Sequence, residues 1–319
     1  MIALTNQARR IAVSVSGLCK TYGEKVVLDG VDLTIGEGEV FALLGPNGAG
    51  KTTIVRILST LIPADAGTAT VMGHDLRGQA GAVRGVIGVT GQFSAVDNLL
   101  TGEENLLLMG RLLHLPASER RARASELLAR FDLVEAARQT PATYSGGMTR
   151  RLDIAMTLMG RPRLIFLDEP TTGLDPRSRQ IMWQLIRGLV AEGVTILLTT
   201  QYLEEADQLA DRIAMLDRGR IVAEGTPEEL KRRMPGAHIR LRFADVASLD
   251  EAARELDHGT RDDENLVLRI PHEGGIRSLR DVLARLGDDV AVEDLSLHTP
   301  DLDDVFFAVT GDQSKEKTP

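Results

Sequence analysis

A glycine-rich loop between an apolar run and a helical pattern constrains the fold of this chain more than any other segment. The apolar run covers residues 40–44, and Gly45 and Gly50-Lys51-Thr52 follow it. This spacing predicts a loop at a helix start whose backbone N–H groups surround phosphates, with Lys51 on phosphate oxygens and the Thr52 hydroxyl on Mg²⁺. A turn that merely joins a strand to a helix is the alternative. The loop residues expected to contact the nucleotide are Gly45, Pro46, Asn47, Gly48, Ala49, Gly50, Lys51, Thr52 and Thr53.

Two carboxylates follow a second apolar run. Residues 164–167 are apolar and lead directly into Asp168 and Glu169. At the end of a buried strand beside the glycine loop, Asp168 would hold Mg²⁺, and Glu169 would polarise or deprotonate the attacking water. The alternative is that both carboxylates cap the turn at Pro170. Together with the loop, this pair predicts a P-loop nucleotidase and no narrower class.

Composition and charge exclude several classes of protein. Apolar residues make up 43% of the chain and charged residues 26%, which is typical of a globular protein. The longest uncharged stretches, such as residues 85–96, are too short for a membrane helix, so with no apolar leader and only Cys19 we expect a cytosolic protein without disulfides. Residues 235–319 hold 10 Lys and Arg against 19 Asp and Glu. This acidic balance disfavours nucleic acid as a partner.

The pattern along the chain predicts two domains. We expect an α/β domain over residues 1–234, with an antiparallel sheet near residues 13–34 and a helical subdomain inserted at about 93–160. Beyond it we expect a small α+β domain over 235–312 and a polar tail over 313–319. The separate elements predicted in the subdomain and the second domain are helices 99–115 and 118–130, strand 238–243, helix 247–256, strand 265–270, helix 275–286, strand 290–297 and helix 301–310.

Residues 144–148, Tyr-Ser-Gly-Gly-Met, resemble the signature sequence of ABC-transporter ATPases, which typically reads Leu-Ser-Gly-Gly-Gln and opens a helix. The resemblance implies that Ser145, Gly146 and Gly147 form a second phosphate site that faces the γ-phosphate held by another chain. It also implies roles for three single residues. Gln92 matches the Q-loop glutamine that touches Mg²⁺, Asp175 matches the D-loop that crosses the dimer interface, and Tyr22 matches the aromatic residue that stacks on adenine.

The chain also departs from the family pattern. Met148 stands where glutamine is usual, Tyr144 where leucine is usual, and Gln201 where most members have the switch histidine. An amide can donate to a phosphate and accept from a neighbour, but it cannot carry a proton charge. We therefore hypothesise that Gln201 positions the γ-phosphate and the water without acid–base chemistry.

The same departures narrow the resemblance to one class. Residues 89–97, 144–148 and 199–207 together resemble the daunorubicin-resistance class of ATP-binding subunits, and residues 300–307 resemble the closing motif of its C-terminal domain. By residue type alone, the closing motif also suits an N-capped helix that packs Val305 and Phe306.

This resemblance implies an ATPase with ATP and Mg²⁺ as cofactors, and a homodimer that holds ATP between the loop of one chain and the signature of the other. It further implies a separate membrane permease bound at the cytoplasmic face of the membrane, and export of an amphipathic drug or a lipid-like substrate. Two alternatives remain open: a soluble ABC ATPase that remodels nucleic acid or ribosomes, and a poorly hydrolysing ATP switch.

Overall fold

The computed structural model describes residues 10–91, 95–232, 238–256, 259–271, 276–286, 290–298 and 300–310. The chain divides into two compact units, Met1–Pro227 and Glu228–Pro319. The division falls before residue 234, where the sequence pattern changes. Gln92 and the predicted tail lie outside the described residues. Within the described ranges, no helix combines the length and the apolar character that crossing a bilayer requires.

A six-stranded sheet forms the centre of the first unit, in the order β10-β9-β3-β8-β7-β6. Its neighbouring strands run parallel except for β10, which pairs antiparallel with β9. All residues of β3, β7 and β8 are buried, which explains their continuous apolar runs. The six strands are β3 (Val40–Leu44), β6 (Ile87–Thr90), β7 (Leu164–Asp168), β8 (Thr195–Thr200), β9 (Arg212–Asp217) and β10 (Arg220–Gly225).

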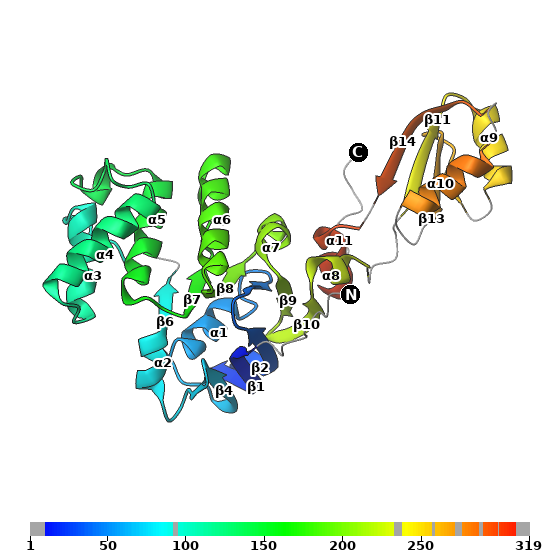
Figure 1. Ribbon diagram of the computed structural model, residues 1–319. Helices are drawn as coiled ribbons and strands as arrows, with labels where there is room; N and C mark the ends of the chain where they lie inside the picture. The colour runs from blue at the N-terminus through cyan, green and yellow to red at the C-terminus, as the bar shows by residue number, and fades with distance from the viewer. Residues whose placement is uncertain are drawn as a thin grey trace, which may run out of the picture. The chain divides into compact units, whose positions relative to one another are not determined.

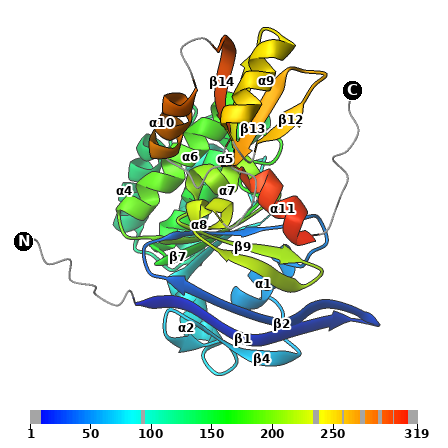
Figure 2. The same ribbon diagram turned by 90° about the vertical axis from the view of Figure 1, so that its right-hand side faces the viewer.

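A second sheet of the first unit is antiparallel and has the order β2-β1-β4-β5. It consists of β1 (Ile11–Tyr22), β2 (Lys25–Gly36), β4 (Ala66–Val71) and β5 (His74–Asp75). Figure 2 shows it in blue and cyan beside α1 (Lys51–Leu58). Apolar residues of this sheet, of α1 and of the central strands form one core, so the phosphate loop is held between two sheets. A short helix, α2 (Ala80–Val86), follows β5 and was not predicted.

Helices α3 (Gly102–Leu112), α4 (Ala117–Arg130) and α5 (Gly146–Thr157), with the 3-10 turns η1 (Pro141–Thr143) and η2 (Leu158–Gly160), lie in the stretch 93–160 for which a helical subdomain is predicted. Figure 1 shows them grouped together in green. The first helix begins at Gly102 and not at Leu99 as predicted, because Thr101 caps it through a reciprocal pair of bonds with Glu104. Helix α6 (Pro176–Ala191) follows β7 in the sequence, and α7 (Leu203–Leu209) follows β8.

The second unit holds a four-stranded antiparallel sheet in the order β12-β13-β11-β14. Its apolar core gathers side chains from the sheet, α9 and α10. The order of strands and helices predicted for residues 238–310 is found, and the short elements α8 and β12 were not predicted. The elements after β10 are α8 (Pro227–Arg232), β11 (His238–Phe243), α9 (Val246–Glu255), β12 (Thr260–Asp262), β13 (Val267–Pro271), α10 (Ile276–Arg285), β14 (Val292–His298) and α11 (Leu302–Thr310).

Candidate functional site

Three neighbouring parallel strands end at one edge of the central sheet and bring the predicted residues together. Leu44 of β3 pairs with Thr200 of β8, and Thr199 of β8 pairs with Asp168 of β7. The residues that follow these strands are Gly45, Gln201 and Glu169. Gln201 therefore emerges between the glycine loop and the carboxylate pair. In open α/β sheets, ligands bind at this carboxyl edge.

The glycine loop leads directly into α1, and its last glycine cannot be replaced without strain. Gly50 has a φ of 113°, and a Cβ built on it would lie 2.6 Å from a Leu28 methyl group and 3.0 Å from the Val27 carbonyl oxygen. Only glycine meets both conditions. Among the described side chains none caps the start of α1. Its first N–H groups, at the positive end of the helix dipole, therefore remain available to an anion.

Lys51 is held inside the loop by hydrogen bonds to the loop backbone. Its Nζ donates to the Gly45 carbonyl at 2.7 Å and to the Pro46 carbonyl at 3.1 Å, and it lies 3.9 Å from a Glu169 oxygen. Burial lowers the pKa of Lys51, while Glu169 and Asp168 oppose the shift. A phosphate placed here would favour the charged amine further, because an opposite charge stabilises the ammonium form.

The carboxylate pair is fixed by the neighbouring strand β8. The buried Asp168 accepts a short hydrogen bond from the Thr199 hydroxyl, and the Thr52 hydroxyl lies 3.3 Å from the same oxygen. The Glu169 backbone N–H is 3.1 Å from both the carbonyl and the hydroxyl oxygen of Thr199, and Glu169 has a left-handed φ of 48°. Such a backbone is uncommon outside glycine, and it is found at functional sites where neighbours hold it in place.

Tyr22, the loop and Glu169 line one hollow of about 380 Å³. Tyr22 is 46% exposed at the tip of the β1–β2 hairpin, with the Lys20 ammonium 5.6 Å from the centre of its ring, and its aromatic face suits stacking on a flat ligand. The other residues that line this hollow are Lys25, Val27, Asn47, Gly48, Gly50, Lys51, Thr52 and Thr53. The hollow therefore offers an aromatic face at one side and a cationic loop with two hydroxyl groups at the other.

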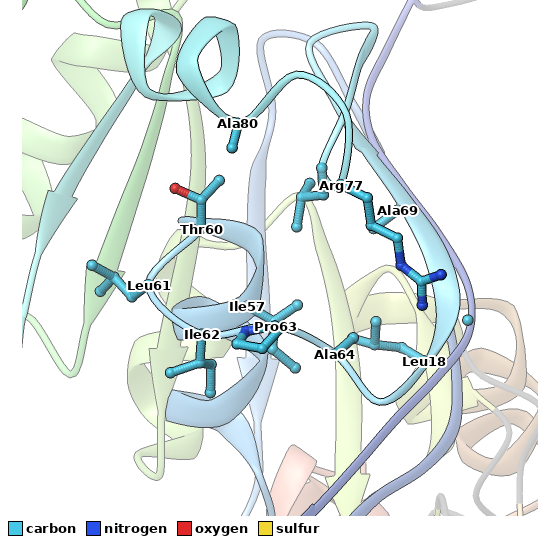
Figure 3. Close-up of a pocket in the computed structure, with 12 residues that line it drawn as sticks. Leu18, Ile57, Thr60, Leu61, Ile62, Pro63, Ala64, Ala69, Arg77 and Ala80 are labelled. Carbon is cyan, nitrogen blue, oxygen red and sulfur yellow. The ribbon is translucent and has the colours of Figure 1, made fainter.

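A second hollow, of about 420 Å³, lies beside the carboxyl end of α1. Figure 3 shows its mostly apolar lining, including Leu61, Ile62 and Pro63, with Arg77 as its charged side chain. Its lining contains no glycine-rich loop and no carboxylate, so Arg77 has neither the loop N–H groups nor the metal ligands that a nucleotide triphosphate site combines.

The signature residues do not line the nucleotide hollow of their own chain. Ser145 caps α5 by accepting from the Met148 N–H at 3.2 Å, and Ser145 and Gly146 are exposed. Gly147 is buried, and a Cβ there would lie 2.6 Å from the Ser178 hydroxyl oxygen. Asp175 in turn caps α6, accepting from the N–H and hydroxyl of Ser178. The signature and the D-loop residue are therefore parts of one packed cluster.

Comparisons with known proteins agree with this geometry. The family model described as ABC transporter matches residues 28–172. A daunorubicin resistance ATP-binding protein of Streptomyces coeruleorubidus is 50% identical over 96% of this chain and 98% of its own length. The chain belongs to the ABC transporter ATP-binding family. A doxorubicin resistance ATP-binding protein of Mycobacterium tuberculosis is 47% identical over 97% of the chain.

Solved structures of ABC cassettes have the same fold as the first unit. A dimeric ATP-binding cassette in a post-hydrolysis state with ADP and phosphate is 30% identical, with a TM-score of 0.61 over 67% of this chain. This confirms the predicted fold class. The protein is thus an ATP-binding and ATP-hydrolysing subunit of an ABC transporter, as the resemblance of the motifs predicted.

Sequence reasoning missed Thr199. This ATP-binding subunit uses its buried hydroxyl to hold Asp168 and its backbone to hold Glu169. The available signal was a hydroxyl side chain at the end of an otherwise apolar strand. Of the predicted site residues, Gln92 lies outside the described residues, while Lys51, Thr52, Asp168 and Glu169 come together at one edge.

Proposed function

We propose that this subunit powers export of an amphipathic drug or a lipid-like molecule through a separate membrane permease. The supporting observation is that its similarity to daunorubicin and doxorubicin resistance ATP-binding proteins spans both units. A Nod factor export ATP-binding protein of Ralstonia nicotianae is also similar, at 39% identity over 95% of the chain. The first kind of relative is named for drug resistance and the second for export, and export of a drug would account for both names.

Mg²⁺ is the proposed metal partner of ATP. The Thr52 hydroxyl and the Asp168 carboxylate are oxygen ligands 3.3 Å apart, which suits a hard cation that also keeps water and phosphate oxygens. The ion would neutralise phosphate charge when bound. Lys51 would grip the β- and γ-phosphates, Glu169 would orient and deprotonate the attacking water, and Tyr22 would stack on adenine. By its family position, Gln92 would join Thr52 and Asp168 at the metal.

We propose that the functional form is a homodimer with ATP at its interface. Support comes from the exposed Ser145 and Gly146 at a capped helix start, away from the chain's own hollow. With Gly147 they present a second anion site to a partner chain, and Asp175 would cross the interface beside them. ATP binding would then supply dimerisation energy, and hydrolysis would release it.

The permease is proposed to dock on the helical subdomain. Large apolar side chains are exposed at both ends of α3: Leu99 is 89% exposed and Leu112 63%, with Leu108 and Leu113 partly exposed nearby. A helix of a membrane partner could bury them. The subunit would then lie peripherally at the cytoplasmic face of the membrane. The acidic residues 235–319 support no nucleic-acid partner.

For the second unit we propose that it steadies the dimer. Its last described helix, α11, is apolar in part, with Leu302 and Val305 buried. The domain limits inferred from sequence, 1–234 and 235–312, remain predictions beside the observed compact units.

Export is tested in cells that express this chain together with a candidate permease from the same genome. We expect lower accumulation of an amphipathic dye or anthracycline than in cells with the Glu169→Gln chain, and co-purification of the chain with that permease. Equal accumulation in both strains would contradict drug export. Co-purification with RNA or ribosomes and no membrane protein would instead support the remodelling alternative.

Gln201→Ala is expected to lower kcat about tenfold with little change in nucleotide affinity, because an amide that orients phosphate and water acts mainly in the transition state. Gln201→His would add a group that titrates at about pH 6.5, so its kcat should become pH-dependent in that range. Steady-state ATPase assays between pH 5.5 and 8.5 measure both effects. Undiminished turnover of Gln201→Ala would show that Gln201 is an ordinary loop residue.

A further inference from the structure

Arg150 is a nearly buried arginine on α5 that leaves the helical subdomain and bonds to the catalytic core. Its Nη2 donates to the Asp168 carbonyl at 2.9 Å, and its Nε donates to the Pro170 carbonyl at 3.1 Å. These two carbonyls flank Glu169. The third nitrogen, Nη1, donates to the Gly91 carbonyl at 2.9 Å. One guanidinium group therefore connects the signature helix with the ends of β6 and β7.

Asp153 completes this connection one helical turn later. It is 3% exposed, it lies 3.1 Å from Arg150 Nη1, and its other oxygen accepts from the Ala95 N–H at 3.2 Å. Gly91 and Ala95 stand on the two sides of residues 92–94. The pair therefore binds backbone groups before and after the segment that carries Gln92.

The geometry of this pair requires its particular side chains. Two buried charges are costly unless they are paired and further hydrogen-bonded, and here each partner has additional backbone contacts. A guanidinium presents several N–H groups in a fixed plane, so it can reach three carbonyls at once, which an ammonium on a flexible stem cannot do with the same precision of direction.

Further along α5, the Thr157 hydroxyl lies 3.1 Å from the Thr90 hydroxyl and 3.4 Å from the Val89 carbonyl. The carboxyl end of α5 therefore contacts β6, while Arg150 bonds the part of α5 near the signature to the backbone at the end of β7. Arg150 lies five positions after Ser145, which is less than two turns of a helix. A shift of the Asp168–Pro170 backbone would be passed along a rigid element to Ser145.

We propose that Arg150 and Asp153 are a positioning pair for ATP hydrolysis, which fixes the signature helix relative to the backbone on both sides of Glu169 and of residues 92–94. Neither side chain faces the nucleotide hollow. The pair acts by holding Glu169 and the start of α5 in one arrangement, so its loss affects the hydrolytic step more than the binding of nucleotide. Where the signature serves a partner chain, which rests on the proposed dimer, the same pair links the two nucleotide sites.

The test compares kcat, KM and the affinity for a fluorescent ATP analogue in the purified full chain. Arg150→Gln removes the guanidinium that bonds to three carbonyl groups at once. We expect kcat to fall at least tenfold while the affinity for the analogue changes less than threefold. Arg150→Lys is expected to recover less than half of the lost kcat. The double variant Arg150→Gln/Asp153→Asn leaves no unpaired buried charge, and it should lose no more kcat than Arg150→Gln because the two residues act as a unit.

Arg151→Gln is the matched control. Arg151 is the next residue on α5 and bonds to the Phe131 carbonyl and to Asp132, both within the helical subdomain. We expect its kcat to stay within threefold of the unchanged chain. The proposal is overturned if the double variant keeps its kcat within threefold, if analogue affinity falls as much as kcat, or if Arg151→Gln loses as much kcat. Dimerisation of each variant is measured separately by size-exclusion chromatography with ATP, so a loss of kcat through the pair is distinguished from a loss of the proposed dimer.

Discussion

Glu169→Gln is expected to lower ATP turnover about 10²–10⁴-fold, the usual contribution of a positioned general base. The amide keeps the shape of the side chain, and the Glu169 backbone stays bonded to Thr199. Nucleotide binding should therefore persist, and it should strengthen because a negative charge is removed from the phosphate site. Single-turnover hydrolysis and equilibrium binding of ATP measure the two effects.

Glu192→Gln is a suitable control because Glu192 pairs with Arg130 on the surface, away from the sheet edge. Its turnover should equal that of the unchanged chain.

Size-exclusion chromatography of Glu169→Gln with ATP should also show a dimer that the chain without ATP does not form. Turnover within threefold of normal for Glu169→Gln would reject Glu169 as the catalytic base and leave the water to another group.

Lys51→Met is expected to weaken ATP binding about 10- to 100-fold. Hydrogen bonds to a charged group contribute about 1.5–3 kcal/mol, and about 1.4 kcal/mol corresponds to a tenfold change in affinity. The stability of the nucleotide-free chain should not fall, because burial of the Lys51 ammonium opposes its charge, as the lowered pKa indicates. Thermal unfolding with and without ATP distinguishes the two effects.

For Lys51→Met we expect an unchanged or higher midpoint without ATP and a much smaller shift when ATP is added. Arg161→Met, which removes an exposed cation from the surface, should retain the full ATP-dependent shift. If Lys51→Met still binds ATP with normal affinity, the two carbonyl bonds of Lys51 reflect a structural role within the loop. The assignment of Lys51 to the phosphates would then be wrong.

The central strands and the glycine loop could be predicted because their information is local. A five-residue apolar run with a glycine loop behind it has few other solutions in an α/β fold. Helix ends were predicted less well. The apolar pattern of α3 extends back to Leu99, yet the helix starts at Gly102 because the capping box of Thr101 and Glu104 sets its first residue. The short elements α2 and β12 carry too few residues for a period to appear.

The site was predicted through residues whose chemistry is visible in a motif, such as Lys51 and Glu169. Thr199 and Arg150 were not predicted, because their roles depend on which carbonyls and carboxylates lie near them after folding. Thr199 bonds to Asp168, which is 31 positions away in the sequence, and a hydroxyl side chain in a strand does not indicate by itself which residue it will contact. The role of Ser145 toward another chain was predicted only through the resemblance of residues 144–148 to the family signature, and it stays a prediction.

The close packing of Gly147 on Ser178 has a consequence for timing. Because a Cβ at Gly147 would lie 2.6 Å from the Ser178 hydroxyl oxygen, the starts of α5 and α6 are in direct contact, and we expect them to move together as one block. In a two-fold dimer, each block would face the nucleotide seated in the opposite chain and would also carry the crossing Asp175. Release of phosphate from one nucleotide site would then loosen the contact of the α5 and α6 starts with the other nucleotide site. The two sites of such a dimer would then hydrolyse ATP one after the other and not independently.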